Sequence, residues 1–295
     1  MFTGAKKTTT GRSNKKNSNT VADLADTNTS DNCYYNLMNT IAIVGYGRFG
    51  ELLCELLAPR FELAVIESEE ARAALAREKS IELIELKDLA RFDTVIFAVP
   101  ISSLDSVVAA AAEYITDNQL VTDVCSVKVH PANVMRKYLP NAKLIATHPM
   151  FGPDSASRGL SGLQVAICPL NATDEVTSEV CSLWEGLGLD VIVTTPEAHD
   201  KDSVLSQAFT YSIARIILGM ELNDIKLTTR SFNAITEVAR LSGKDSAQLF
   251  DDMLFYNPYF PAMKQELIGS INSTLEKLSE IETEQRKSSI FRDKN

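Results

Sequence analysis

The hexapeptide Gly45-Tyr46-Gly47-Arg48-Phe49-Gly50 constrains the fold more than any other part of this sequence, because it joins two regular elements. It follows the short apolar run Thr40–Val44, which is typical of a buried strand, and precedes the helical stretch Glu51–Leu57. In such a unit the first glycine allows a tight turn, the second admits a pyrophosphate, and the third lets helix pack on strand. The hexapeptide therefore predicts a dinucleotide-binding turn, with a tight turn that binds no ligand as the alternative.

Strand-like and helical segments alternate over the first two thirds of the chain, and only helices follow. The predicted strands are Thr40–Val44, Glu62–Ile66, Thr94–Val99, Leu120–Val124, Lys143–Ala146, Leu163–Cys168 and Asp190–Thr194. After Pro196 the predicted helices are Ala198–Glu221, Thr229–Leu241, Ser246–Tyr256 and Pro261–Ile281. This pattern predicts an α/β fold, a Rossmann-type doubly wound parallel sheet followed by an all-helical dimerisation domain.

Four segments follow from this pattern. We expect a disordered leader at 1–37, because its first 32 residues hold 15 Ser, Thr or Asn and few large apolar side chains. A dinucleotide-binding domain is expected at 38–196, a helical substrate and dimerisation domain at 197–281, and a charged tail at 282–295. The leader lacks the apolar core of a secretory signal and is acid-rich for an organellar transit peptide. The chain is therefore expected to be cytoplasmic, with organellar targeting as the weaker alternative.

Charge and composition exclude several function classes. The chain has 29 Lys and Arg against 39 Asp and Glu, a net charge of −10, which disfavours non-specific nucleic-acid binding. No apolar run is long enough to span a membrane. The five cysteines form no CxxC pair and there are three histidines, so we expect buried thiols of a reducing compartment and no metal site.

The end of the second predicted strand bears on the choice of cofactor. Glu67 lies seventeen residues after Gly50, where a carboxylate accepts hydrogen bonds from the adenosine ribose hydroxyls and repels a 2′-phosphate. No arginine follows until Arg72. This favours NAD over NADP, although Glu69 or Glu70 could instead mark a helix cap.

Candidate catalytic residues follow the predicted strands. His148 comes just after a strand, where it would face the ligand cleft and accept a proton from a hydroxyl during hydride transfer. Ser126 follows another strand and could bind a substrate hydroxyl or the imidazole, and Lys128 could bind a carboxylate. The alternatives are a loop histidine held by the backbone, a helix N-cap at Ser126 and a solvated Lys128.

Two residues of the helical half are also candidates. His199 stands beside Asp200 at the start of a helix, and the alternative is a helix N-terminal residue with no chemical role. Arg240 interrupts an apolar helix, which is costly unless the guanidinium has an anionic partner. That partner is either a substrate carboxylate or an intramolecular one, Glu237 or Asp245.

Together these motifs resemble the prephenate/arogenate dehydrogenases of tyrosine biosynthesis, and the plant-type arogenate dehydrogenases in particular. The segments that carry the resemblance are Gly45–Gly50, Phe97–Pro100, Asp123–Lys128, Lys137–Pro140, Thr147–Pro153, His199–Arg215 and Leu254–Asn257. Of these, Thr-His-Pro-Met-Phe-Gly-Pro at Thr147–Pro153 is highly specific and the glycine motif is not. The resemblance covers about Thr40 to Ile281.

The resemblance implies NAD(P)-dependent oxidative decarboxylation of prephenate or arogenate. By this resemblance His148 is the catalytic histidine, Ser126 orients the ring hydroxyl and the imidazole, and Arg240 binds the ring carboxylate. Further substrate contacts are expected from Lys128, His199, Gln207 and Tyr211. Cofactor contacts are expected from Gly45, Tyr46, Gly47, Arg48, Phe49, Gly50, Glu67, Val99 and Pro100. The helical half of the family dimerises, so a homodimer is expected.

Two departures from the family limit what carries over. Family members commonly have a second histidine where this chain has Tyr211. This departure leaves open whether the substrate is prephenate or arogenate. Plant-type members favour NADP through a Ser-Arg pair, whereas this chain has Glu67-Ser68. The alternatives to this function are another Rossmann-plus-helical dehydrogenase, of the β-hydroxyacid type, and a dinucleotide-sensing protein without activity.

Overall fold

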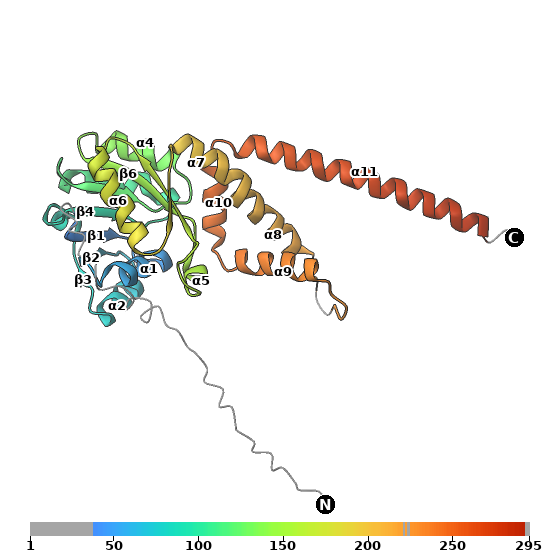
Figure 1. The fold of residues 1–295 in the computed structure, drawn as a ribbon, viewed down its shortest axis with the longest axis horizontal. Helices are drawn as coiled ribbons and strands as arrows, with labels where there is room; N and C mark the ends of the chain where they lie inside the picture. The colour runs from blue at the N-terminus through green and yellow to red at the C-terminus, as the bar shows by residue number, and fades with distance from the viewer. Residues whose placement is uncertain (1–37, 221, 223–224, 293–295) are drawn as a thin grey trace, which may run out of the picture.

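The structure is a computed structural model that describes residues 38–220, 222 and 225–292. The expected leader at 1–37 and the last three residues of the expected tail lie outside these ranges. The described part has a sheet domain and a helical half that extends away from it (Figure 1). The two halves meet close to Pro196, where the first helix of the helical half begins.

An eight-stranded sheet forms the centre of the sheet domain, with strand order β3-β2-β1-β4-β5-β6-β7-β8. The strands are β1 Thr40–Val44, β2 Glu62–Ile66, β3 Glu82–Leu83, β4 Thr94–Phe97, β5 Leu120–Asp123, β6 Lys143–Pro149, β7 Gln164–Pro169 and β8 Asp190–Val193. The chain winds outward from β1 in one direction and then, from β4, in the other. This reversal confirms the Rossmann-type doubly wound fold, and it creates a ligand crevice at the carboxyl ends of β1 and β4.

Each strand contributes to a core on both faces of the sheet. In β1 the side chains of Ile41 and Ile43 enter one core, while those of Ala42 and Val44 enter the other. The first core is covered by α1 Arg48–Leu57, α2 Glu70–Glu78, α5 Pro153–Ala156 and α6 Asp174–Gly186. The second is covered by the 3-10 turn η2 Leu86–Arg91, α3 Ile101–Ala111 with the turn η3 Ala112–Tyr114, and α4 Val129–Tyr138.

The sheet differs from the expected one in two respects. β3 has two residues, too few to give a hydrophobic pattern that sequence reasoning can detect. The pair β6–β7 is antiparallel, so the sheet is mostly rather than wholly parallel. The link between these strands, residues 150–163, contains only the four-residue helix α5, and it returns the chain at the edge where β6 ends. A parallel pair would need a crossover to the opposite edge.

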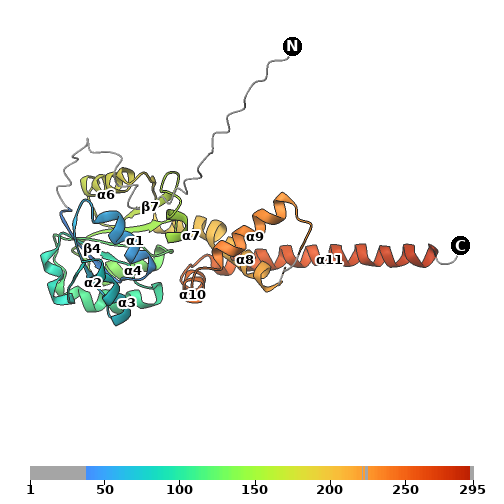
Figure 2. The same cartoon turned by 90° about the horizontal axis from the view of Figure 1, so that it is seen from below.

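The helical half packs on the second core. It comprises α7 Pro196–Ser203, the π-helical turn η4 Val204–Ala208, α8 Phe209–Gly219, α9 Arg230–Ser242, α10 Ala247–Phe255 and α11 Phe260–Arg292. The helix expected over Ala198–Glu221 is therefore interrupted by a π turn. α11 continues past the expected boundary between residues 281 and 282, and it projects from the body in both views (Figures 1 and 2).

A carboxylate of the helical half caps a helix of the sheet domain. Asp252 on α10 accepts hydrogen bonds from the Ser102 backbone N–H at 3.0 Å and from the Ser102 hydroxyl at 2.7 Å. Ser102 lies in the first turn of α3, whose N-cap residue Pro100 provides no side-chain bond. The cap supplies an acceptor for an otherwise unpaired N–H and binds α10 to the sheet domain.

The glycine turn provides a stability test. A Cβ at position 50 would lie 2.1 Å from the Gly45 carbonyl oxygen, whereas a Cβ at Gly47 meets nothing within 4 Å. Gly50→Ala is therefore expected to lower stability by about 1–3 kcal/mol, a drop of about 5 °C in Tm. Gly47→Ala is the matched control and should leave the Tm unchanged. Equal melting temperatures for the two variants, measured by calorimetry, would contradict this packing.

Candidate active site

The glycine turn lies at the carboxyl edge of the sheet between β1 and α1. Gly45 has φ +105°, and a Cβ there would lie 2.5 Å from the Ala98 carbonyl oxygen, so this position requires glycine. Gly47 is the N-cap residue of α1, and the space over its Cα is open. No side chain caps this helix, so its first N–H groups are available to an anion. These features fit the pyrophosphate of a dinucleotide.

The other residues expected to contact the cofactor gather at the same edge in different ways. Val99 and Pro100 follow β4, and Val99 lies against Gly45. The Phe49 ring packs against Phe151 at 6.0 Å between centroids. The Tyr46 side chain is fully buried, and burial raises the pKa of its phenol to about 12. Only the backbone of Tyr46 therefore faces the turn.

Glu67 is bonded to the glycine turn itself. One carboxylate oxygen accepts the Tyr46 N–H at 2.7 Å, and the other accepts the Glu69 N–H at 2.8 Å. Because each carboxylate oxygen has two acceptor sites, these bonds leave capacity for a ribose hydroxyl. The side chain thus links the end of β2 to the turn after β1.

Arg48, at the start of α1, bridges the two halves of the molecule. Its guanidinium pairs with Asp154 on α5 at 2.7 Å, and Lys244 of the helical half pairs with the other oxygen of Asp154 at 2.8 Å. The hydrogen bonds from Lys244 and Arg48 lower the pKa of Asp154 to about 2. Arg48 therefore engages a protein carboxylate instead of pointing freely toward a phosphate.

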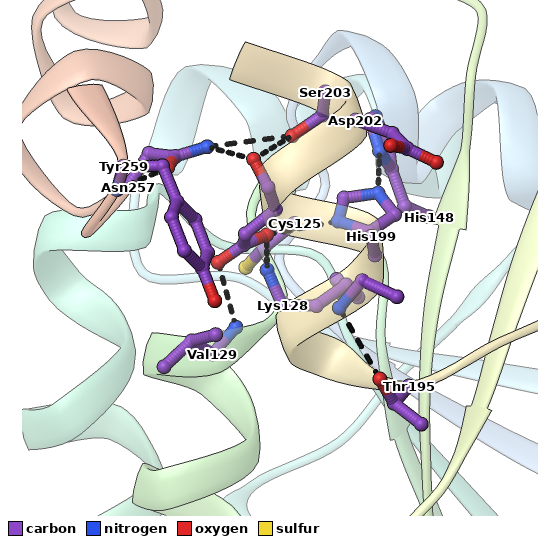
Figure 3. Close-up of polar contacts among 12 residues, drawn as sticks. Cys125, Lys128, Val129, His148, Thr195, His199, Asp202, Ser203, Asn257 and Tyr259 are labelled. Carbon is purple, nitrogen blue, oxygen red and sulfur yellow. Dashed lines mark hydrogen bonds and ion pairs between the residues drawn. The ribbon is translucent and has the colours of Figure 1, made fainter. Parts of the chain in front are cut away.

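A chain of hydrogen bonds connects three side chains at the junction between β6 and α7. His148, near the end of β6, is 3% exposed, and its Nδ1 lies 2.9 Å from Nε2 of His199 on α7. The Nδ1 of His199 lies 2.8 Å from Oδ1 of Asp200. Figure 3 shows the two imidazoles side by side, with α7 supplying His199. Residues distant in sequence thus form one polar chain.

The carboxylate at the end of this chain determines the tautomer of both rings. Asp200 accepts a hydrogen bond from Nδ1–H of His199, so the other nitrogen of that ring, Nε2, serves as an acceptor. His148 must then donate from Nδ1, which leaves its Nε2 unprotonated. Burial, His199 and the cation of Lys128 together hold the pKa of His148 well below its ordinary value. His148 is therefore a neutral imidazole with a free basic nitrogen at neutral pH.

Asp200 is itself held by the backbone of the sheet domain. Its Oδ1 accepts the Lys128 N–H at 2.6 Å and its Oδ2 accepts the Val129 N–H at 2.9 Å, which caps the first turn of α4. Asn257, after α10, donates to the Asp200 carbonyl oxygen at 2.9 Å (Figure 3). Our sequence analysis assigned no role to Asp200 or Asn257. The His199-Asp200 pair was the available signal, because a carboxylate beside a histidine commonly orients it.

Lys128 differs from the expected substrate ligand. Its side chain is fully buried, and its ammonium forms an ion pair with Asp123 and donates to the Thr147 carbonyl oxygen. Asp123 is also fully buried, so neither charge faces solvent. The ammonium is therefore buried and already paired with a protein carboxylate, and it does not face a cleft as the sequence analysis expected of a substrate ligand.

Ser126, Gln207 and Tyr211 occupy different surroundings. Ser126 is half-buried in the segment between β5 and α4, and within the described ranges its hydroxyl has no hydrogen-bond partner. Gln207 lies in the π turn η4, where its Oε1 is buried without a partner among the described residues. The Tyr211 hydroxyl bonds to Asp245, and burial together with that bond raises the pKa of the phenol.

Arg240 forms an intramolecular ion pair, which was the alternative reading of its sequence context. Its Nε and Nη2 donate to the two carboxylate oxygens of Glu237 at 2.8 and 2.7 Å. The Arg240 side chain is 55% exposed on α9, so it is not buried in an apolar helix as the sequence suggested. The guanidinium is accessible, and a competing carboxylate would have to displace Glu237.

No cluster of His, Cys, Asp and Glu suited to a metal ion occurs in the described part of the chain. Within the same ranges, no helix combines the length and the apolar character that a membrane span needs.

Comparisons with known proteins agree with this architecture. Residues 61–193 match the family model described as "Prephenate dehydrogenase, nucleotide-binding domain". Arogenate dehydrogenase 2 of Arabidopsis thaliana, named as chloroplastic, is 26% identical over 258 residues, which covers 80% of this chain and 72% of the relative. Arogenate dehydrogenase 1 of the same plant is 23% identical, over 79% of this chain and 40% of the relative.

Solved structures share the fold over most of the chain. The prephenate dehydrogenase of A. aeolicus, solved with hydroxyphenyl propionate and NAD+, superposes with a TM-score of 0.67 at 18% identity, covering 87% of this chain and 96% of that one. Synechocystis arogenate dehydrogenase gives a TM-score of 0.61 at 18% identity, covering 86% and 99%. Residues 61–193 thus match the nucleotide-binding domain of the prephenate dehydrogenases, and over most of its length the chain is similar to the plant arogenate dehydrogenases.

Proposed function

We propose that this protein catalyses the NAD(P)-dependent oxidative decarboxylation of prephenate or arogenate, a reaction of tyrosine biosynthesis. The observation that carries the proposal is the chain Asp200–His199–His148, which presents an unprotonated ring nitrogen near the carboxyl edge of the sheet. The glycine turn lies at the same edge. A base and a dinucleotide turn at one edge suit the oxidation of a hydroxyl.

His148 is the proposed general base. Its Nε2 accepts the proton of the ring hydroxyl as the carbon that bears the hydroxyl loses its hydride. A bound nicotinamide supplies the hydride acceptor, and the ring becomes aromatic as its carboxylate leaves as CO₂. Asp200 and His199 keep Nε2 unprotonated before each turnover, because any other tautomer breaks one of their two hydrogen bonds.

Substrate contacts are proposed for residues that have free polar atoms near this junction. Ser126 provides an unpaired hydroxyl after β5, and Gln207 provides a buried amide oxygen without a partner among the described residues. His199 contacts His148 and is therefore proposed to act through it. Tyr211 and Arg240 are proposed substrate ligands that exchange Asp245 and Glu237 for the substrate.

The cofactor is proposed to be NAD, with its pyrophosphate on the N-terminus of α1 and its adenosine ribose beside Glu67. The Glu67 carboxylate supports this, because it is fixed at the turn by two backbone bonds and would repel a 2′-phosphate.

A homodimer through the helical half is also proposed. α11 carries an apolar seam with the spacing of a coiled-coil helix, formed by Ile268, Ile271, Leu275 and Leu278. These four side chains are exposed, as are Phe209, Ile216, Leu218, Ile235 and Val238 on α8 and α9. An isolated helix with such a face is marginal in water, so a second copy that covers it would stabilise it.

Substitution of the proposed base tests the activity. His148→Asn is expected to reduce kcat about 10²–10⁴-fold, which is the usual contribution of a general base. The Kd for NAD should not change, because the glycine turn is untouched. Turnover is followed as NADH absorbance at 340 nm with prephenate and with arogenate. A variant that keeps nearly native turnover with both substrates would refute the proposed function.

Cofactor choice is tested at Glu67. Loss of one hydrogen bond to a charged group, worth about 1.5 kcal/mol, should reduce the preference for NAD over NADP about tenfold in Glu67→Ser. The exposed neighbour Glu69 is the matched control, and Glu69→Ser should keep the native preference. The measurement is kcat/KM for each cofactor. A native protein that prefers NADP would contradict the assignment.

Dimerisation is tested on the seam of α11. Leu275→Glu should give a monomer by light scattering at micromolar concentration, since a buried carboxylate in an apolar interface is costly. Ser273→Glu places the same charge on the opposite side of the helix and should leave the dimer intact. A native protein that is monomeric under these conditions would exclude the interface.

A further inference from the structure

Lys128 is the fully buried cation nearest the proposed base, and the proposed function gives it no task. Its ammonium contacts two acceptors, the Asp123 carboxylate and the carbonyl oxygen of Thr147, the residue that precedes His148. Thr147 in turn donates from its hydroxyl to the Asp123 carbonyl oxygen at 2.6 Å. The end of β5 and the end of β6 are thus tied together around one ammonium.

The backbone of the same residue reaches the other side of the site. The Lys128 N–H donates to Oδ1 of Asp200 at 2.6 Å, and that oxygen also accepts from His199. Lys128 is therefore linked to the base by two routes, through Thr147 on the strand that carries His148 and through the carboxylate that orients His199. No other residue of the described part bonds to both Thr147 and Asp200.

We propose that Lys128 is a positioning residue for the proton acceptor, a fixed cation that holds the end of β6 in place and disfavours a second positive charge on His148. The proposal rests on the proposed function, because it takes His148 as the base.

The charges around His148 support this role. His199 on α7 bonds to the imidazole, the Lys128 ammonium bonds to the carbonyl oxygen of the preceding residue, Thr147, and both lower the pKa of His148. Two carboxylates are bonded to these groups: Asp123 is paired with Lys128, and Asp200 is bonded to His199. The backbone partner strand β7 contributes the apolar Ala166 opposite His148. Among the described residues, neither carboxylate bonds to His148 itself.

A purely structural ion pair is the competing explanation, and burial alone does not favour it. Two charges removed from water lose several kcal/mol of hydration, and a well-packed apolar pair is often as stable. Asp123 keeps one oxygen, Oδ1, buried without a partner among the described residues, so the pair is not optimised for stability. An ion pair that is retained beside a base at a cost in stability is consistent with a functional role for the Lys128 charge.

The test measures the pKa of His148 directly. The chain has three histidines, so labelled imidazole resonances can be followed by NMR, and His148→Asn identifies the signal of interest. Lys128→Met removes the cation at similar side-chain length. We expect the pKa of His148 to rise by about 1 unit, and the acidic limb of the kcat/KM profile to move to higher pH by the same amount. The sign follows because a base must be unprotonated to act.

A second variant separates the effect of losing the Lys128 charge from the effect of misfolding. Lys128→Met leaves Asp123 unpaired and is expected to lower the Tm. The double variant Lys128→Met/Asp123→Asn removes both charges. In the native protein the Cys125 N–H donates to Asp123 Oδ2 at 2.9 Å, and the amide oxygen of the introduced asparagine can still accept this bond. This variant should fold and show the same rise in the pKa of His148. The matched control is Lys79→Met, which removes a lysine paired with Glu51 and Glu55 far along the sheet and should leave both readouts unchanged.

The outcomes separate the two proposals. If the pKa of His148 and the acidic limb are unchanged in the folded double variant, Lys128 is only a structural residue and this inference is overturned. The NMR readout needs no turnover, so it reports on Lys128 even if His148→Asn shows that His148 is not the base. A raised pKa in both Lys128 variants, but not in Lys79→Met, supports the inference.

Discussion

The arrangement of the site depends on the Asp200 carboxylate. It belongs to the helical half, yet it accepts two backbone N–H groups from the first turn of α4 in the sheet domain. The same oxygen that accepts from Lys128 also accepts from His199. One side chain therefore caps a helix, joins the halves and selects the tautomer of two imidazoles. Asp252 on α10 caps α3 in the same way, so two helix caps fix the orientation of the halves.

The fold was largely predictable because its signals are local. β1, the glycine turn and α1 follow one another within eighteen residues, and each has a short-range pattern. The direction of β7 was not predicted, because the alternation of strands and helices favours parallel pairing, and the link from β6 to β7 holds only the four-residue helix α5 instead of a crossover. The π turn η4 was likewise hidden, because one extra residue per turn leaves the apolar periodicity of so short a segment almost unchanged.

The site was predictable only in part. His148 was expected just after a strand and lies near the end of β6, and its position at the sheet edge could be inferred from that placement alone. The surroundings of a charge could not be inferred, because they depend on residues distant in sequence. Lys128 was expected to face a substrate and is buried against Asp123, whereas Arg240 was expected to be buried and is exposed beside Glu237. A charged residue in an apolar run indicates that a partner exists, but not which one.

The two histidines also determine where positive charge goes after proton uptake. In the proposed reaction, a proton that reaches Nε2 of His148 makes an imidazolium whose Nδ1 lies 2.9 Å from the acceptor nitrogen, Nε2, of His199. Transfer of the Nδ1 proton places the cation on His199, beside the anion of Asp200 and one ring farther from Lys128. Under the proposed function, the pair of rings would form a short proton path that runs from the reacting hydroxyl toward a buried counterion. The Lys128 cation on the His148 side and the Asp200 anion on the His199 side determine the direction in which the proton moves.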